Sequence, residues 1–205
     1  MHRAVMLLML VASLIRGAEA TIVFLGDSLT AGFGLDESLA YPALIQEAQP
    51  TWKVINAGVS GDTSAGGLRR LAWILKAKPT VVFIALGAND GLRGLPTEQL
   101  AQNLNSIIRL IRAAGATPVL AGMRLPANYG EDYRTRFAAM YEQLATSTQT
   151  PFMPFLLEGV AMNPEFNQTD AVHPNAAGQQ LIATQVLAFL QARIVANANM
   201  LPVPP

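Results

Sequence analysis

Short apolar segments of strand length alternate with longer segments of helical periodicity along most of the chain. The segment 80–86 is apolar at every position after Thr80, which is typical of a central parallel strand buried on both faces. The segment 97–114 repeats apolar residues every three or four positions and stops at Gly115, as an amphipathic helix does. Together these patterns predict strands at 21–25, 52–56, 80–86, 119–121 and 152–153, and helices at 41–48, from Ser64, at 97–114, at 133–145 and from about Pro174.

Strand and helix therefore alternate about five times, and this alternation predicts an α/β fold. We expect a three-layer α/β/α sandwich in which a parallel five-stranded sheet is covered by helices on both faces. Ser64 is the expected cap of the second helix, and the last helix is expected to bury Phe189. In such a sheet, ligands bind beyond the carboxyl ends of the strands.

The first twenty residues are typical of a signal peptide. Arg3 precedes an apolar run at 4–15, and Ala18-Glu19-Ala20 places small residues where a signal peptidase cleaves. The alternative is a membrane anchor, but a run of twelve residues is shorter than the ~20 apolar residues that cross a bilayer. We therefore expect export to the periplasm or the medium, one domain at 21–195, and a flexible Pro-rich tail at 196–205, with no membrane insertion after cleavage.

Composition excludes several classes of function. The chain has 205 residues, 51% of them hydrophobic, which is enough for one domain with a substantial core. Its 14 basic and 14 acidic residues include no basic cluster, so nucleic acid is not expected as a partner. The absence of cysteine excludes a thiol nucleophile and a thiolate metal site. His2 leaves with the signal segment, and His173 is then the only histidine.

Three loops at the predicted carboxyl ends carry polar residues that a plain connection would not need. They are 26–29 after the first strand, 56–64 after the second and 87–90 after the third. Because these strands are expected to be neighbours, Ser28, Gly61 and Asn89 are expected to meet at one edge of the sheet. A fourth segment, Asp170-Ala-Val-His173, lies just before the last helix.

These residue types suit nucleophilic catalysis by a serine. The Ser28 hydroxyl needs a general base, and only His173 can supply one. Asp170, three residues away, can orient the imidazole and stabilise its cation. The N–H groups of Ser28 and Gly61 and the amide of Asn89 can donate to an oxyanion, where losing one donor typically costs ~10²–10³ in rate.

At these residues the chain resembles the SGNH hydrolases, also called the GDSL family. Four blocks centred on a serine, a glycine, an asparagine and a histidine define that family. They stand here in order as Gly26-Asp27-Ser28-Leu29, Gly61, Gly87-Ala88-Asn89-Asp90 and Asp170-Ala171-Val172-His173. The segments 60–64, 89–94 and 125–130 resemble the bacterial periplasmic thioesterases, lysophospholipases and arylesterases of the family.

The resemblance covers about 21–194 and implies a flavodoxin-like sheet, an acyl-serine intermediate, and neither metal nor cofactor. It implies a hydrolase of carboxylic esters and thioesters whose substrates are fatty acyl esters, lysophospholipids, aryl esters or acyl thioesters. Two departures stand outside the catalytic groups: Ala88 replaces a frequent glycine, and the stretch 41–50 is a little shorter. We expect a monomer.

An acyl groove is expected beside the serine. The segment 91–96 follows Asn89 and holds two glycines, which favours a mobile loop that lines the groove, or else a plain connection. The expected substrate-binding residues are Gly91, Leu92, Leu95, Leu125 and Pro126. Asp27 and Asp90 are expected to brace their loops by accepting backbone N–H bonds.

Each assignment has a structural alternative. Ser28 and Asn89 can cap helices, Gly61 can permit a turn, and His173 can mark the entry to a helix. At the level of function, the alternatives are a carbohydrate O-acetylesterase of the same fold, a non-catalytic lipid- or glycan-binding module, and a nucleotide-binding flavodoxin-like protein. The last is disfavoured because the first loop lacks a glycine-rich phosphate cradle.

Overall fold

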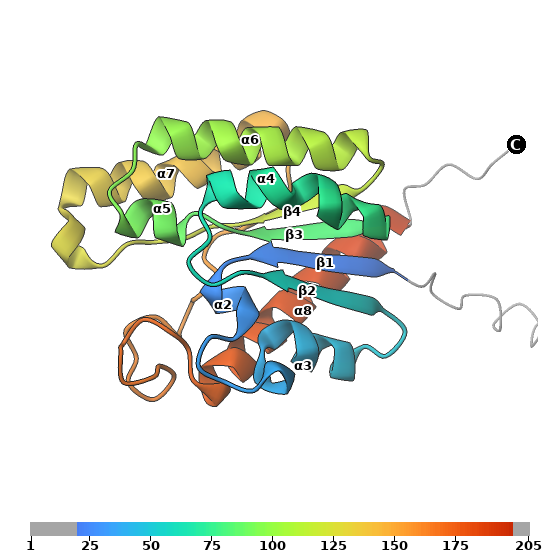
Figure 1. Cartoon of the computed structure of the whole chain (residues 1–205), viewed down its shortest axis with the longest axis horizontal. Coiled ribbons are helices and arrows are strands. Elements are labelled where there is room, and N and C mark those ends of the chain that lie inside the picture. Colours follow the sequence, from blue (N-terminus) through green and yellow to red (C-terminus); the bar gives the residue numbers. More distant parts are fainter. Residues whose placement is uncertain (1–19, 199–205) are drawn as a thin grey trace, which may run out of the picture.

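The computed structural model describes residues 20–198, in which five strands form one parallel sheet (Figure 1). The strands are β1 (Thr21–Gly26), β2 (Lys53–Gly58), β3 (Val81–Ala85), β4 (Thr117–Ala121) and β5 (Phe152–Met153), and their spatial order is β2-β1-β3-β4-β5. The predicted parallel sheet is confirmed, and its order is that of flavodoxin-like folds, with the winding direction reversing between β1 and β3. The predicted signal segment and most of the predicted tail lie outside the described residues.

Helices cover both faces of the sheet. In Figure 1, α3 (Tyr41–Ala48) and α8 (Ala176–Ala198) lie on one face, and α4 (Ser64–Ile74), α6 (Thr97–Ala113) and α7 (Glu131–Thr148) lie on the other. Two short helices, α2 (Ser28–Ala31) and α5 (Ala88–Leu92), stand at the carboxyl ends of β1 and β3. Single 3₁₀ turns occur as η1 (Glu37–Leu39), η2 (Leu75–Ala77) and η3 (Ala127–Tyr129).

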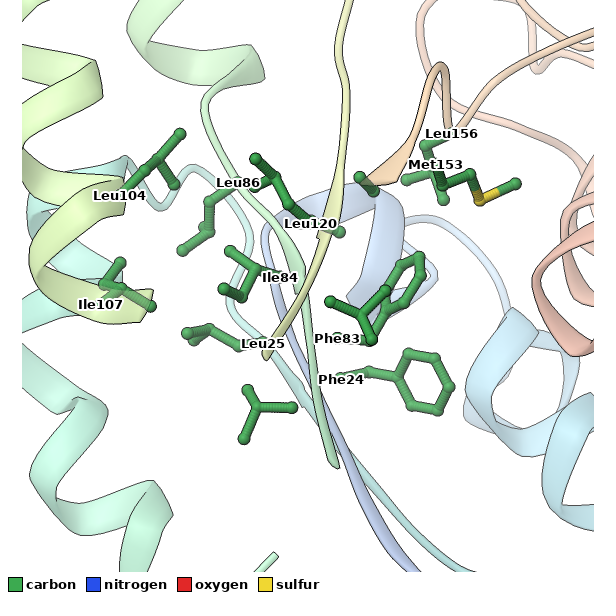
Figure 2. Packing of buried hydrophobic residues seen from close by; sticks show 14 of the residues in the cluster. Phe24, Leu25, Phe83, Ile84, Leu86, Leu104, Ile107, Leu120, Met153 and Leu156 are labelled. Atoms are coloured by element: carbon green, nitrogen blue, oxygen red, sulfur yellow. The ribbon is translucent and has the colours of Figure 1, made fainter. Parts of the chain in front are cut away.

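The core lies on both faces of the central strands because successive side chains of a strand point in opposite directions. Figure 2 shows Leu25 and Ile84 pointing toward Leu104 and Ile107 of α6, whereas Phe24 points to the opposite face. All of these side chains are fully buried. Burial of each contributes roughly 1.5–3 kcal/mol, so the strands that carry the site loops are firmly held.

Several boundaries differ from the expectation. β2 continues to Gly58, where it pairs with Gly26 at the end of β1, and α7 begins two residues before the predicted start. α8 begins at Ala176 because Pro174 instead forms a bridge with Asn167. The helix also continues through 196–198, which were assigned to the tail.

Two side-chain expectations were wrong. Ser64 is the first residue of α4 and not its cap, because Thr63 occupies the cap position and its hydroxyl accepts from the Gly66 N–H. Phe189 packs against the core but is only partly buried. Neither α2 nor α5 was predicted, because helices of four and five residues are too short to show a period.

Among residues 20–198, every helix is too short or too polar to cross a membrane.

Candidate active site

Ser28 is the first residue of α2, immediately beyond the carboxyl end of β1. Asp27 caps this helix, and its Oδ1 accepts the N–H of Leu29 at 3.0 Å. This confirms that Asp27 braces its loop. The site therefore begins where the winding of the sheet reverses, between β1 and β3, which is where open α/β sheets bind ligands.

Ser28, His173 and Asp170 form a continuous hydrogen-bonded line. The Ser28 Oγ lies 3.0 Å from His173 Nε2, and His173 Nδ1 lies 2.6 Å from Asp170 Oδ2. If Nδ1 carries its proton toward the carboxylate, Nε2 presents a lone pair to the serine hydroxyl. The structure thus brings together three side chains that the sequence separates by up to 145 residues.

The carboxylate of Asp170 is stabilised in its ionised form by the turn that carries it. Its Oδ1 accepts the N–H groups of Val172 and His173, each at 2.9 Å. The His173 N–H, then the imidazole and the Val172 N–H, lower the pKa of Asp170 to about 2. Asp170 is therefore an anion at neutral pH.

A phenyl ring covers the imidazole. The ring centroids of Phe33 and His173 lie 4.5 Å apart at an interplanar angle of 39°. Gln168 ties the two segments together, since its side-chain amide donates to Phe33 O and its backbone N–H to His173 O. Phe33 was not predicted, because a single aromatic residue in a turn has no pattern that marks its role.

Asn89 lies in α5, directly after β3, and its amide faces Asp27. The Asn89 Nδ2 donates to Asp27 Oδ2 at 3.3 Å. An amide nitrogen has two hydrogens, so one remains for a ligand. Burial raises the pKa of Asp27 to about 6, while the Leu29 N–H and the Asn89 amide act in the opposite direction.

The second loop reaches the same edge. The Val59 N–H donates to Gly26 O at 3.1 Å, which joins the ends of β2 and β1. Gly61 follows in an exposed turn with φ of 78°, and its carbonyl accepts from Arg93 Nη2 at 2.9 Å.

Asp90 ties this loop to the third one, because it accepts from both the N–H and the hydroxyl of Ser64. Asp90 thus braces a loop, as expected, but a neighbouring loop and not its own.

An apolar cavity of about 310 Å³ opens beside Ser28. Of the predicted substrate-binding residues, Leu92, Leu125 and Pro126 line it. The full lining is Asp27, Ser28, Leu29, Ala88, Asn89, Leu92, Arg124, Leu125, Pro126, Phe155, Leu157, Ala161, Met162, Ala171, Val172 and His173. A larger hollow of about 590 Å³ beside α7, lined by both polar and apolar residues, contains none of the three hydrogen-bonded residues.

Gly91 and Leu95 lie outside this lining. A Cβ at Gly91 would lie 2.6 Å from the Phe137 ring and 2.7 Å from Leu125. Close packing against these two side chains therefore leaves room only for glycine at this position. Leu95 donates its N–H to Asp90 O and leaves its side chain partly exposed. The structure thus does not bring these two residues to the cavity, and their role in substrate binding stays a prediction.

One part of the cavity lining was not predicted from the sequence. It comes from the segment 155–162, between β5 and α8, with Leu157 and Met162 among its lining residues. Met162 is 72% exposed. The signal was present as two groups of three apolar residues, 155–157 and 160–162, in a segment without helical or strand periodicity, which is unusual for a surface loop.

Residues 24–181 match the model of the GDSL-like Lipase/Acylhydrolase family. The chain belongs to this family. This GDSL-like acylhydrolase is 44% identical over 187 residues to thioesterase 1/protease 1/lysophospholipase L1 of Escherichia coli K12, covering 90% of each chain. It is 42% identical over 181 residues to esterase TesA of Pseudomonas aeruginosa, covering 86% of this chain and 90% of that one.

The three-dimensional comparison agrees. The crystal structure of esterase EstA from Pseudoalteromonas matches with a TM-score of 0.82 and 35% identity, covering 86% of this chain and 99% of that one. As a member of the acylhydrolase family, the protein hydrolyses ester bonds, which confirms the predicted class of enzyme. Within residues 20–198, no group of three or more acidic or histidine side chains gathers as metal ligands would.

Proposed function

We propose that the protein hydrolyses acyl esters through an acyl-serine intermediate, with Ser28 as nucleophile and His173 and Asp170 as its activating pair. The observation that carries this proposal is the hydrogen-bonded line from Ser28 Oγ to His173 and Asp170, which opens onto an apolar cavity. Distances of 3.0 and 2.6 Å are within reach for proton transfer without rearrangement.

In the first half of the reaction, Ser28 Oγ attacks the acyl carbonyl carbon while His173 Nε2 takes the hydroxyl proton. The tetrahedral intermediate collapses as the imidazolium returns that proton to the leaving alcohol or thiol. In the second half, water attacks the acyl-serine, His173 accepts a proton from it, and the proton returns to Ser28 Oγ as the carboxylic acid leaves. Asp170, held as an anion, stabilises the imidazolium in both halves.

The oxyanion of each tetrahedral intermediate needs donors at fixed positions. We assign this role to the N–H of Ser28, the N–H of Gly61 and the amide of Asn89. Support comes from the position of Ser28 at the start of α2 and from the bond of Asn89 to Asp27, which leaves one amide hydrogen for the oxyanion. Such preorganised donors usually supply the largest share of rate enhancement.

The cavity favours a substrate with an apolar acyl chain. Its volume of about 310 Å³ is at the lower end of small-molecule sites, and its walls include Leu92, Leu125, Leu157 and Met162. Each buried methylene contributes roughly 0.8 kcal/mol to binding. An acetyl group would leave most of these walls without a contact, so the geometry favours fatty acyl esters, aryl esters, lysophospholipids and acyl thioesters over the acetylated carbohydrates of an O-acetylesterase.

The sequence of the first twenty residues supports export, with cleavage after Ala20, to the periplasm or the medium. An exported enzyme meets lysophospholipids and other exogenous acyl esters, whereas acyl-CoA stays in the cytoplasm. We propose on this ground that esters are its working substrates, and that hydrolysis of thioesters is an accompanying capacity of the same site.

A series of p-nitrophenyl esters from acetate to palmitate, together with lysophosphatidylcholine, tests the proposal on the chain that begins at Thr21. We expect kcat/KM to rise with chain length before it falls, and Ser28→Ala to lose roughly 10⁴–10⁶ in turnover. Labelling of Ser28 by a fluorophosphonate would agree. Full hydrolysis by Ser28→Ala, or a preference for acetylated sugars, would be incompatible with the proposal.

A further inference from the structure

Arg70 of α4 makes three hydrogen bonds that join two loops of the site. Its Nη2 donates to Gly26 O at 2.9 Å, and its Nη1 donates to Ala57 O at 2.6 Å. Its Nε donates to Asp62 Oδ2 at 2.7 Å. Each guanidinium nitrogen therefore has an acceptor of its own: two are backbone carbonyl oxygens and the third is a side-chain carboxylate.

The positions of these acceptors relate Arg70 to the proposed oxyanion hole. Gly26 ends β1 and stands two residues before Ser28. Asp62 directly follows Gly61 in the loop after β2. One planar, rigid group thus spans the two chain segments that carry the proposed backbone donors. Arg70 itself is absent from the residues that line the cavity, so any effect on the reaction passes through those segments.

Burial and close packing fix the positions of the Arg70 and Asp62 side chains. The Arg70 and Asp62 side chains are only 22% and 10% exposed, so both charges need partners. A Cβ at Gly66 would overlap with Asp62 Oδ1, and only glycine lets the carboxylate approach the first turn of α4. There the anion also interacts favourably with the helix N-terminus. The seat of Asp62 is therefore fixed from two sides.

We propose that Arg70 is a positioning residue of the reaction, which sets the spacing between the N–H groups of Ser28 and Gly61 in the oxyanion hole. This inference rests on the proposed function. Lysine cannot replace it, because an ammonium is a point charge and lacks the three directed donors of a guanidinium fork. A misplacement of about 1 Å in such a site can cost ~10² in rate.

The expected effect on kcat and KM depends on the stage of the reaction at which the N–H groups of Ser28 and Gly61 bind the oxyanion. The two N–H groups bind an oxyanion that exists only in the transition state and the tetrahedral intermediates, whereas the acyl chain is bound throughout. For Arg70→Lys we therefore expect kcat toward p-nitrophenyl octanoate to fall roughly 10–100-fold, with KM changed less than about twofold. The inhibition constant of an alkylboronic acid, whose serine adduct mimics the tetrahedral intermediate, should rise by a comparable factor.

The matched control is Arg69→Lys, because Arg69 is exposed on the same helix. This variant should keep kcat, KM and boronate affinity. Near-ultraviolet circular dichroism and the unfolding midpoint establish that each variant is folded at the assay temperature. Folded Arg70→Lys with kcat and boronate affinity within about twofold of the wild type would overturn the inference, because Arg70 would then serve stability alone.

Asp62→Asn decides the question if Arg70→Lys does not fold. It removes the charged acceptor but leaves the bonds of Arg70 to Gly26 and Ala57. A decrease in kcat of about threefold or more at constant KM supports the inference, and an unchanged kcat overturns it. The Ser28→Ala variant separates this inference from the proposed function. If Ser28→Ala is active, the assignment of Ser28 as the nucleophile is wrong. If Ser28→Ala is inactive and Arg70→Lys is fully active, only the role inferred for Arg70 is wrong.

Discussion

Replacing Asp27 by asparagine should make the protein more stable and less active at neutral pH. Asp27 is fully buried, and burial raises its pKa from 3.8 to about 6. Because the pKa is higher in the folded state, the contribution of Asp27 to stability is complete below pH 3.8 and is lost as pH rises through 6. Above pH 6 the folded protein therefore holds a buried charge that it would hold more easily when unfolded.

The expected gain can be worked from these two values. The interval between 3.8 and about 6, at 1.36 kcal/mol per pH unit, corresponds to about 3 kcal/mol at pH 8. Asparagine keeps an oxygen for the N–H of Leu29 but gives up the stronger bond that a charged acceptor makes. We expect the free energy of unfolding to increase by about 1–3 kcal/mol at pH 8 and to change little at pH 4.

The same substitution should impair catalysis through Asn89. Asp27 Oδ2 accepts from Asn89 Nδ2 at 3.3 Å, and an asparagine that satisfies Leu29 would turn its own NH₂ group toward this donor. Asn89 would then lose the acceptor that orients it. Since loss of a whole oxyanion donor costs ~10²–10³, we expect kcat to fall roughly 10–100-fold.

Urea unfolding at pH 4, 6 and 8, with kcat at pH 8, tests both parts. Asp36→Asn is the control, because Asp36 is an exposed carboxylate nearby in the chain and its loss removes a charge without relieving burial. A gain in stability that is absent at pH 8, or as large at pH 4 as at pH 8, would refute the argument from burial. An unchanged kcat would refute the role of Asp27 in orienting Asn89.

Two further substitutions test the site and its packing. Asp170→Asn should lower kcat by roughly 10⁴ in assays between pH 6 and 9, as in other serine triads. Because the pKa of Asp170 is about 2, its contribution to stability is present above pH 3.8 and is lost only toward pH 2. A loss of wild-type activity centred near pH 4 that the Asp170→Asn variant does not show would contradict the assignment. Gly91→Ala should destabilise the fold by about 1–3 kcal/mol because its Cβ meets the Phe137 ring, and Gly94→Ala, which meets nothing but has φ of 64°, should cost about 1 kcal/mol; urea unfolding of the pair checks this order, and equal losses would disprove it.

The fold and the centre of the site could be predicted because both rest on signals that are local in sequence. A buried strand such as Val81–Ala85 is apolar throughout, and α6 repeats its apolar residues with a helical period. Reactive residue types are rare enough to be informative, and His173 stands out as the one histidine beyond the predicted signal segment. The order of the blocks along the chain then indicated which loops meet.

The periphery of the site could not be predicted, because its residues are chosen by contacts between distant segments. Gly91 was expected to contribute to a mobile loop, yet its size is dictated by contact with Phe137, which lies more than forty residues away. Met162 lines the cavity from a segment with no periodicity, and Phe33 covers the imidazole from a turn. Ser64 looked like a helix cap, because serine is common there, but Asp90 engages its hydroxyl.

The great separation of Ser28 and His173 along the chain has a consequence for synthesis. Ser28, the proposed nucleophile, lies in the first strand-to-helix turn, whereas His173, its proposed base, lies just before the last helix, which packs beside α3. During synthesis, Ser28 therefore lacks its proposed base until nearly the whole chain has left the ribosome and the last helix has packed against the sheet.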